Sequence, residues 1–136
     1  MIKPIPYYKT IPFHNLGKKH GLMFNENTNY IGYFKGKILC GVAGYDILKS
    51  KSIIRSAFVL EEYRGRGFYD ELVEFRLNKI KERGKTNIIQ STCTINSLQY
   101  HLKRGAEVVK KYKKYTKIQY IIQWEYIKRI MFLMKD

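Results

Sequence analysis

The chain has 136 residues, 45% of them hydrophobic and 15% aromatic, and 26 Lys and Arg against 11 Asp and Glu give a formal net charge of +15. This length predicts one domain, residues 1–136, with enough apolar residues for a core. No run approaches the roughly 20 apolar residues of a membrane span, Met1–Pro6 lacks the apolar stretch of a secretory signal, and Cys40 and Cys93 fit neither a disulfide framework nor metal-ligand spacing with a histidine. We therefore expect a protein of the reducing cytoplasm.

The N-terminal region is predicted to contain little regular structure. All three prolines fall within the first twelve residues, so Met1–Phe13 is expected to be extended or loop-like. Residues 14–27 are rich in Asn, Lys and Gly and predict a loop with at most one short helix.

Three β-strands are predicted next. Tyr30–Phe34 and Lys37–Ala43 read as paired strands, because the Lys35-Gly36 step between them is a tight-turn signal. A third apolar run, Ser52–Leu60, follows a polar turn. Together the three runs predict an antiparallel meander.

The strongest helix signal covers Phe68–Arg83. Apolar residues recur at helical spacing, acidic residues open the segment and basic residues close it, and Gly84 is a natural stop. Asn87–Thr92 then reads as a buried strand. With the strand before the helix it predicts a strand–helix–strand unit, hence a parallel pair with a right-handed crossover.

The C-terminal third predicts a short helix at Asn96–Lys103, ending at Gly105, and a hairpin of Glu107–Val109 with Tyr115–Trp124. Ile127–Met134 is apolar and fits either a strand or a helix. The fold class is therefore α+β, with a mixed, mostly antiparallel sheet and one parallel β-α-β crossover.

The joint between the third strand and the long helix carries the clearest functional pattern. Arg64-Gly65-Arg66-Gly67 stands immediately before a helix N-terminus, where backbone N–H groups and the helix dipole favour anions. The glycines allow close backbone approach, and the arginines supply charged donors. The segment lacks the Gly-Lys-Ser/Thr of a P-loop and the third glycine of a dinucleotide-binding turn.

Val59–Gly67, followed by a long helix, a strand and a short helix ending in glycine, resembles the core of the GCN5-related N-acetyltransferases (GNAT). That family's signature, Arg/Gln-x-x-Gly-x-Gly/Ala, cradles the pyrophosphate of acetyl-CoA with backbone amides. Arg64 fills its first position and Gly67 its fourth, whereas Tyr69 replaces the final Gly or Ala. The resemblance implies the GNAT fold, with helices on both faces of the sheet and a shortened N-terminal region, and acetyl-CoA as co-substrate.

The resemblance also implies a proton donor. Counted back from Gly105, His101 stands where the family has the tyrosine that protonates the departing CoA thiolate, and Tyr100 precedes it. Either side chain has suitable chemistry, but consecutive helical side chains point roughly 100° apart. Ser97 takes the Ala/Ser position of the same motif and is included among the cofactor contacts.

By the same resemblance, the thioester carbonyl should meet the backbone near Phe58–Leu60. Asp46 is the candidate for removing the amine proton, while Glu61 and Glu62 read as surface turn residues. The predicted cofactor contacts are Phe58, Val59, Leu60, Arg64, Gly65, Arg66, Gly67, Phe68, Tyr69 and Ser97.

The implied activity is transfer of an acetyl group from acetyl-CoA to an amine by direct attack. Two alternatives stay open. One is a DNA-modifying protein similar to the Mom type, and the other is a non-catalytic basic module that binds nucleic acid or an acidic partner. Such a partner would meet a cluster of basic residues interleaved with tyrosines, although the lysines also fit a solvated surface. The cluster is Lys103, Arg104, Lys110, Lys111, Lys113, Lys114 and Lys117, with Tyr112 and Tyr115.

Overall fold

The computed structural model describes residues 1–84 and 86–122, and it leaves the side chain of Asn96 undescribed. The segment predicted at Ile127–Met134, and the last residues of the strand predicted at Tyr115–Trp124, lie outside this part. No helix among the described residues is long and apolar enough to cross a membrane. The described residues form two compact units, one of residues 1–46 and 53–79 and one of residues 47–52, 80–84 and 86–122.

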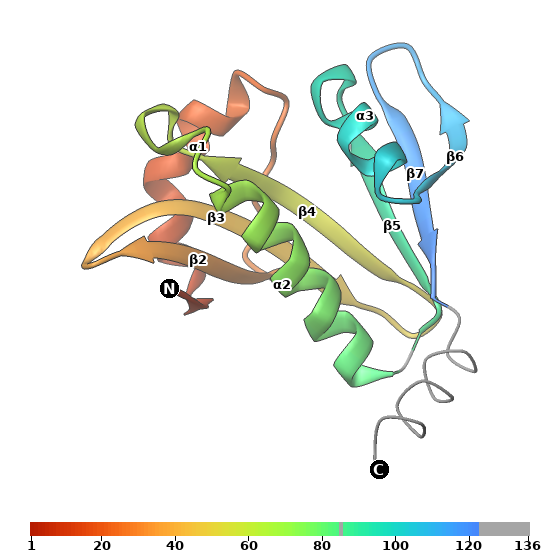
Figure 1. The fold of residues 1–136 in the computed structure, drawn as a ribbon, viewed down its shortest axis with the longest axis horizontal. Helices are drawn as coiled ribbons and strands as arrows, with labels where there is room; N and C mark the ends of the chain where they lie inside the picture. The colour runs from red at the N-terminus through yellow and green to blue at the C-terminus, as the bar shows by residue number, and fades with distance from the viewer. Residues whose placement is uncertain (85, 123–136) are drawn as a thin grey trace. The chain divides into compact units, whose positions relative to one another are not determined.

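The elements follow the chain as Figure 1 shows. The first unit holds β1 (Ile2–Ile5), a single 3-10 turn (Tyr7–Thr10), α1 (Ile11–Lys18), β2 (Asn29–Lys35), β3 (Ile38–Ile47), β4 (Ser52–Val59), a second 3-10 turn (Glu61–Tyr63) and most of α2 (Phe68–Arg83). The second unit holds β5 (Ile88–Cys93), α3 (Ile95–Lys103), β6 (Glu107–Lys111) and β7 (Thr116–Ile121). The strand order is β1-β2-β3-β4-β5-β7-β6. The predicted α+β class, with its β4-α2-β5 crossover, is confirmed.

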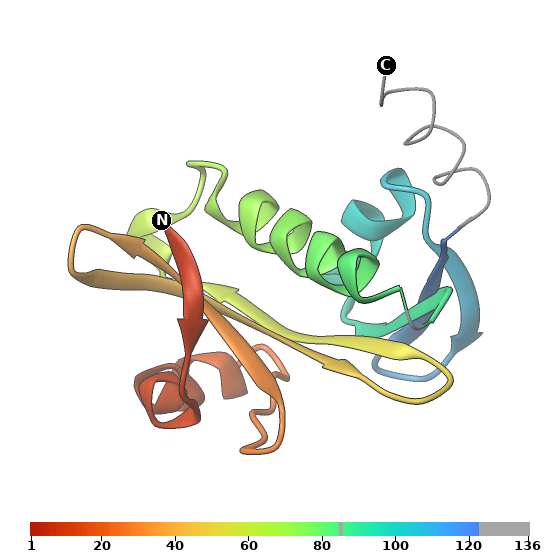
Figure 2. The same cartoon turned by 90° about the horizontal axis from the view of Figure 1, so that it is seen from below.

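In the strands of the first unit, successive side chains point to opposite faces of the sheet, so one packs against α1 and the next against α2. Phe13 of α1 packs with Tyr30, Val42 and Phe58 on one face. On the other face, Leu72 of α2 packs with their neighbours in sequence, which are Ile31, Ala43 and Val59. Figure 2 shows α1 and α2 on opposite sides of these strands. Helices on both faces of the sheet were predicted, and this is confirmed.

The N-terminal prediction is partly wrong. Residues 2–5 are extended as expected and pair antiparallel with β2. One short helix was allowed within residues 14–27, but α1 already begins at Ile11, in the segment predicted to be extended or loop-like. Pro12 stands in the first turn of that helix, where its missing N–H has no intrahelical partner to lose. Pro12 therefore marks the start of a helix rather than its absence.

The predicted meander is confirmed, with a longer second strand. Gly36 makes the turn between β2 and β3 with φ +62°. Pairing continues as far as Asn29 opposite Tyr45, and β3 ends only at Ile47.

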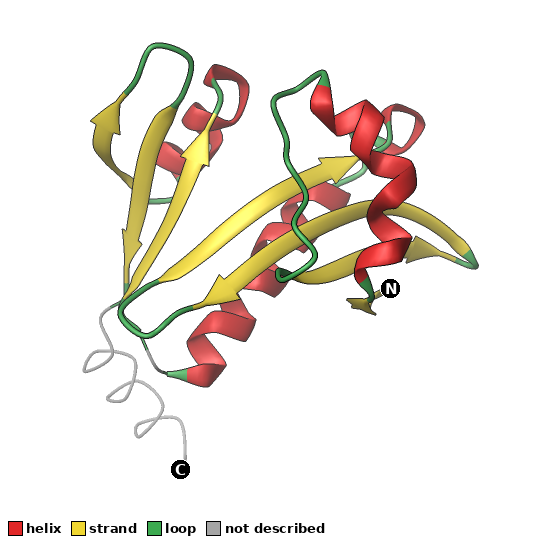
Figure 3. Ribbon diagram, turned by 180° about the vertical axis from the view of Figure 1, so that it is seen from behind, coloured by secondary structure: helices red, strands yellow, loops and turns green. Residues whose placement is uncertain are grey.

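The second unit contains an antiparallel sheet in the order β5-β7-β6, with α3 beside it (Figure 3). Cys93, Ala106 and Ile118 form its small core, and Leu98 and Tyr120 pack against that core. The predicted short helix and C-terminal hairpin are confirmed. All five residues of β6 are exposed.

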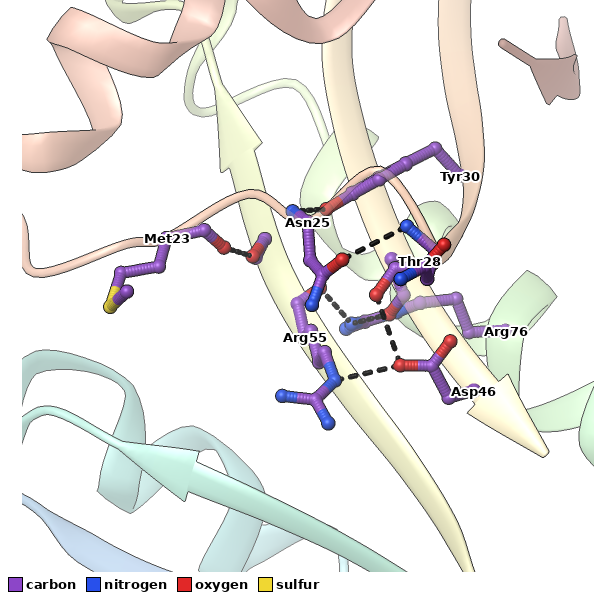
Figure 4. A network of polar contacts seen from close by, with 10 residues as sticks. Met23, Asn25, Thr28, Tyr30, Asp46, Arg55 and Arg76 are labelled. Atoms are coloured by element: carbon purple, nitrogen blue, oxygen red, sulfur yellow. Dashed lines mark hydrogen bonds and ion pairs between the residues drawn. The ribbon is translucent and has the colours of Figure 1, made fainter. Parts of the chain in front are cut away.

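A buried arginine ties α2 to the sheet of the first unit. Arg76 is only 2% exposed, and its Nη1 donates to the carbonyl oxygens of Gly44 on β3 (3.2 Å) and Arg55 on β4 (3.0 Å). The next residue, Ser56, leaves the extended conformation with φ +51°, and its hydroxyl donates to the Met23 carbonyl. Figure 4 shows Arg76 as part of this polar network, with Arg55 and Asp46. The Arg76 side chain therefore both attaches α2 to the sheet and bonds the backbone of β4 next to its irregular residue, Ser56.

Arg76→Ala is expected to lower the free energy of unfolding by about 3 kcal/mol, because it leaves two buried carbonyl oxygens without this charged donor and opens a cavity. Urea unfolding followed by circular dichroism measures the loss. The exposed Asn78→Ala, on the same helix, serves as the control and should change stability by less than about 0.5 kcal/mol. Equal stability of the two variants would contradict this account of Arg76.

Candidate cofactor-binding site

The loop from β4 to α2 has the backbone geometry predicted from its two glycines. Gly65 has φ +77° and Gly67 has φ +83°, both in the left-handed region that residues with a Cβ avoid. A Cβ built on either glycine would meet nothing within 4 Å. The glycines are therefore needed for their backbone conformation, and the space beside them is open.

Helix α2 begins at this loop. The amide of Glu71 donates to the Gly67 carbonyl oxygen at 3.1 Å, which is the first helical hydrogen bond. The N–H groups at the start of a helix have no partner one turn back, and with the helix dipole they favour an anion. Residues 64–67 are all exposed, so an anion in solvent can reach them.

Both loop arginines fold back onto the loop. Arg64 Nε donates to the Val59 carbonyl at 2.9 Å, and its guanidinium lies 5.1 Å from the centre of the Phe58 ring. Arg66 Nη2 donates to the Glu62 carbonyl at 3.2 Å. Each of these hydrogen bonds uses one of the five N–H donors of a guanidinium. Arg64 thus fixes the loop to the end of β4, Arg66 fixes it to the 3-10 turn, and both bring positive charge beside the start of α2.

The end of β4 is held by backbone hydrogen bonding. The Leu60 amide donates to the Cys40 carbonyl at 2.9 Å, which commits it to pairing with β3. Within the predicted carbonyl-binding segment Phe58–Leu60, the Leu60 N–H is therefore already used.

The departure from the family signature is accommodated by packing. Tyr69 is half-buried and packs against the cluster of Ile31, Val59 and Leu72 under α2. Phe68 stacks on Tyr33, with ring centres 4.0 Å apart. Both aromatic residues therefore belong to the contact between α2 and the sheet.

Asp46 does not lie at the strand end where its predicted function would place it. Its Oδ2 accepts hydrogen bonds from Thr28 Oγ1 (3.0 Å) and Arg55 Nε (2.8 Å), as Figure 4 shows. Asp46 is six residues along β3 from Cys40, the partner of Leu60. At about 3.3 Å per residue that separates it from the end of β4 by about 20 Å. Its ion pair joins β3 to β4, and its hydrogen bond with Thr28 adds the residue before β2.

His20, which was not among the predicted site residues, reaches the end of β4. Its exposed ring lies 5.7 Å from the Phe58 ring, the same ring that Arg64 covers. By contrast, His14 is bonded to Thr10 Oγ1 at 2.9 Å and stacked on an aromatic ring, as a packing residue would be. The contact of His20 with Phe58 could not be predicted from neighbouring residues, because it forms only when the segment after α1 folds against β4.

The predicted proton donors lie in the second unit. His101 is 3% exposed, and its Nδ1 is 2.6 Å from the hydroxyl of Tyr120 on β7. Tyr100 is half-buried, edge-on to the His101 ring. Ser97 Oγ donates to the Thr94 carbonyl at 3.4 Å in the first turn of α3. Tyr120 was not predicted, since strand pairing alone brings it to the helix.

No group of three or more His, Cys, Asp or Glu side chains in residues 1–84 and 86–122 is arranged to hold a metal ion.

Beside the loop, a hydrogen bond with Glu71 and burial raise the pKa of Tyr33 above its usual 10.0. Burial is the main cause of the raised pKa of Tyr30. Because the folded-state pKa is raised in both cases, the stability that these tyrosines contribute is present below pH 10 and is lost as the pH rises through the folded pKa.

Glu71→Gln should lower the pKa of Tyr33 toward 10, because the neutral amide no longer disfavours the phenolate. The measurement is a pH titration of ring-labelled tyrosines by NMR. Tyr30 is the internal control, and its pKa should stay raised because burial is the main cause. A Tyr33 pKa that is the same with and without the Glu71 carboxylate would show that the contact is not made.

Comparison with known proteins finds similarity only at the level of the fold. No family model and no curated protein sequence matches the chain. Among solved structures, the ribosomal-protein-S18-alanine N-acetyltransferase of Escherichia coli is 9% identical, with a TM-score of 0.74 over 90% of this chain and 93% of that one. NAA60 of Arabidopsis thaliana in complex with acetyl-CoA is 10% identical, with a TM-score of 0.70 over 90% and 98%.

The PaiA N-acetyltransferase of Thermoplasma acidophilum, in complex with coenzyme A, is 13% identical, with a TM-score of 0.63 over 83% of this chain and 70% of that one. These similarities extend over both compact units. The chain therefore has the GNAT fold, as its glycine loop and element order predicted.

Proposed function

We propose that this chain is an N-acetyltransferase that binds the pyrophosphate of acetyl-CoA at Arg64–Gly67. The observation that carries the proposal is the loop geometry: two left-handed glycines directly precede the N-terminus of α2. Support comes from the fold, because similar structures are N-acetyltransferases, two of them solved with acetyl-CoA or coenzyme A.

The loop supplies binding energy through its backbone. Amides at the start of α2 donate to phosphate oxygens, and the absence of side chains at Gly65 and Gly67 lets the phosphates approach. Arg64 and Arg66, already anchored to carbonyls of the same segment, add positive charge at little further entropic cost. Phe68 and Tyr69 pack against the sheet on the α2 face, and Leu60 packs on the α1 face.

The thioester carbonyl would meet the backbone of Phe58 and Val59, and the amine would attack it directly. The new C–N bond forms as the C–S bond breaks, so the amine must lose a proton and the CoA thiolate must gain one. A preorganised strand end is suited to the first requirement of such a reaction, which is fixed orientation of the carbonyl.

His20 is the proton acceptor that the geometry favours. An imidazole nitrogen can accept a proton, and the exposed His20 ring lies beside the ring of Phe58, the residue whose backbone is the predicted carbonyl contact. Asp46 lies near the opposite end of the strand and is held by Arg55 and Thr28. For the thiolate, the proposed donors are Tyr100 and His101, to which the hydrogen-bonded Tyr120 is added.

The cofactor site is tested by thermal unfolding with acetyl-CoA. A concentration of about 100 times Kd should stabilise the folded chain by about 2.7 kcal/mol, a shift of several degrees in Tm. Gly67→Val should abolish that shift, because a side chain at positive φ distorts the loop and projects into the phosphate site. Gly36→Val is the matched control: it has a similar φ, +62°, and similarly open surroundings, but lies in the β2–β3 turn.

The control should lose stability yet keep the full shift with acetyl-CoA. Equal shifts for the two valine variants would place the phosphates elsewhere. A wild-type chain that does not respond to acetyl-CoA at all would favour the alternative of a non-catalytic module.

His20→Gln should lower kcat/KM by about 100-fold, the usual contribution of a general base, and leave the acetyl-CoA thermal shift unchanged. The assay is release of the CoA thiol, with the amine that gives the highest rate in a screen of peptides and nucleosides. Lys19→Gln, a change at the exposed neighbour, is the control and should keep wild-type activity. If both variants are equally active, His20 does not accept the proton.

A further inference from the structure

The β6–β7 hairpin, residues 107–121, presents a surface that the proposed reaction does not use. Every residue from Glu107 to Tyr115 is exposed, and in β7 only Ile118 is buried. The strands pair through Val108 with Ile118 and Lys111 with Thr116. The distal half of the hairpin, Lys110–Lys117, therefore contributes no fully buried side chain to the core, and its composition is not explained by folding.

The charge of the hairpin is strongly one-sided. It carries five lysines and one acidic residue, Glu107, at its base; the lysines are Lys110, Lys111, Lys113, Lys114 and Lys117. Within the described part of the chain, no carboxylate forms a salt bridge with any of them. Lys103 is also exposed, at the end of α3 in the same unit. Like charges at this density repel one another, so a polyanion that bound here would relieve that repulsion.

Two tyrosines stand among these lysines in a fixed arrangement. The rings of Tyr112 and Tyr115 stack with their centres 4.7 Å apart, and they remain 41% and 43% exposed. The Tyr112 amide donates to the Tyr115 carbonyl at 2.9 Å, so the turn itself holds the pair together. Lys110 Nζ lies 5.1 Å from the centre of the Tyr112 ring.

We infer that the tip of this hairpin, Lys110–Lys117, binds single-stranded nucleic acid. Unpaired bases would stack on the outer face of the Tyr115 ring, and on that of Tyr112 when Lys110 turns from the ring to a phosphate, while the other lysines contact the phosphates on either side. The stacked rings favour a single strand over the other polyanions that the lysines could bind. An acidic protein would engage the lysines but has no planar bases for the rings, and a duplex keeps its base faces covered. The inference does not depend on acetyl-CoA binding.

The test is fluorescence anisotropy of the full-length chain with a labelled 12-nucleotide single strand, as DNA and as RNA, across a salt series. The double variant Tyr112→Ala/Tyr115→Ala should raise Kd about 10-fold or more, the usual effect of losing stacked bases. Tyr8→Ala, which changes a 65% exposed tyrosine of the first unit, should leave Kd unchanged.

The lysines are tested by charge. Lys113→Gln/Lys114→Gln should weaken binding and reduce the slope of log Kd against log salt by about 0.7 for each phosphate that the variant no longer neutralises. Lys49→Gln/Lys51→Gln removes the same charge from the β3–β4 turn and should leave the slope unchanged. All four lysine positions are exposed or half-buried, so these variants should fold.

Three results would overturn the inference. They are no binding of the single strand at low salt, equal binding of a duplex of the same sequence, or reduced affinity in the lysine variant with unchanged affinity in the tyrosine variant. The last result would indicate a surface for any polyanion, including an acidic protein. Acetyl-CoA thermal shifts of the same variants should match the wild type, which separates failure of this surface from failure of the cofactor site.

Discussion

The end of β4 is the point on which the first unit and its candidate site depend. Phe58 and Val59 are adjacent, so the pleat sends one side chain to the α1 face and the other to the α2 face. Arg64 then contacts both, because its Nε bonds the Val59 carbonyl and its guanidinium covers the Phe58 ring. Packing on both faces of the sheet therefore holds Phe58 and Val59 in place, and the loop that contains Gly65 and Gly67 follows them.

The arginines and lysines of this chain serve different purposes according to their surroundings. Arg76 is buried and satisfies backbone carbonyls where β4 departs from regular geometry. Arg64 and Arg66 shape a loop that remains exposed. The lysines of the β6–β7 hairpin surround a stacked tyrosine pair. The net charge of +15 thus combines a structural cation, a candidate cofactor site and a candidate polyanion surface.

The candidate site shows the limit of inference from motifs. The glycine loop was predictable because left-handed φ, helix start and anion binding all follow from consecutive residues. Asp46 was predicted as the group that removes the amine proton, but β3 continues past the predicted end at Ala43 to Ile47 and carries Asp46 away from the end of β4. The exposed His20 beside Phe58, and Tyr120 beside His101, come from elements distant in sequence.

The sequence by itself determined the order of elements from β2 onward, the bounds of α2, the turn at Gly36 and the glycine loop, since each depends on local backbone preference or on a repeat of apolar residues. Only the tertiary structure decided that Tyr69 packs from α2 against the sheet, that Asp46 is held by Arg55, and that His20 reaches Phe58. It also stacked Tyr112 on Tyr115. The physical reason is that local conformation is set by neighbours along the chain, whereas which side chains meet depends on strand register and length, where a shift of one residue changes every contact.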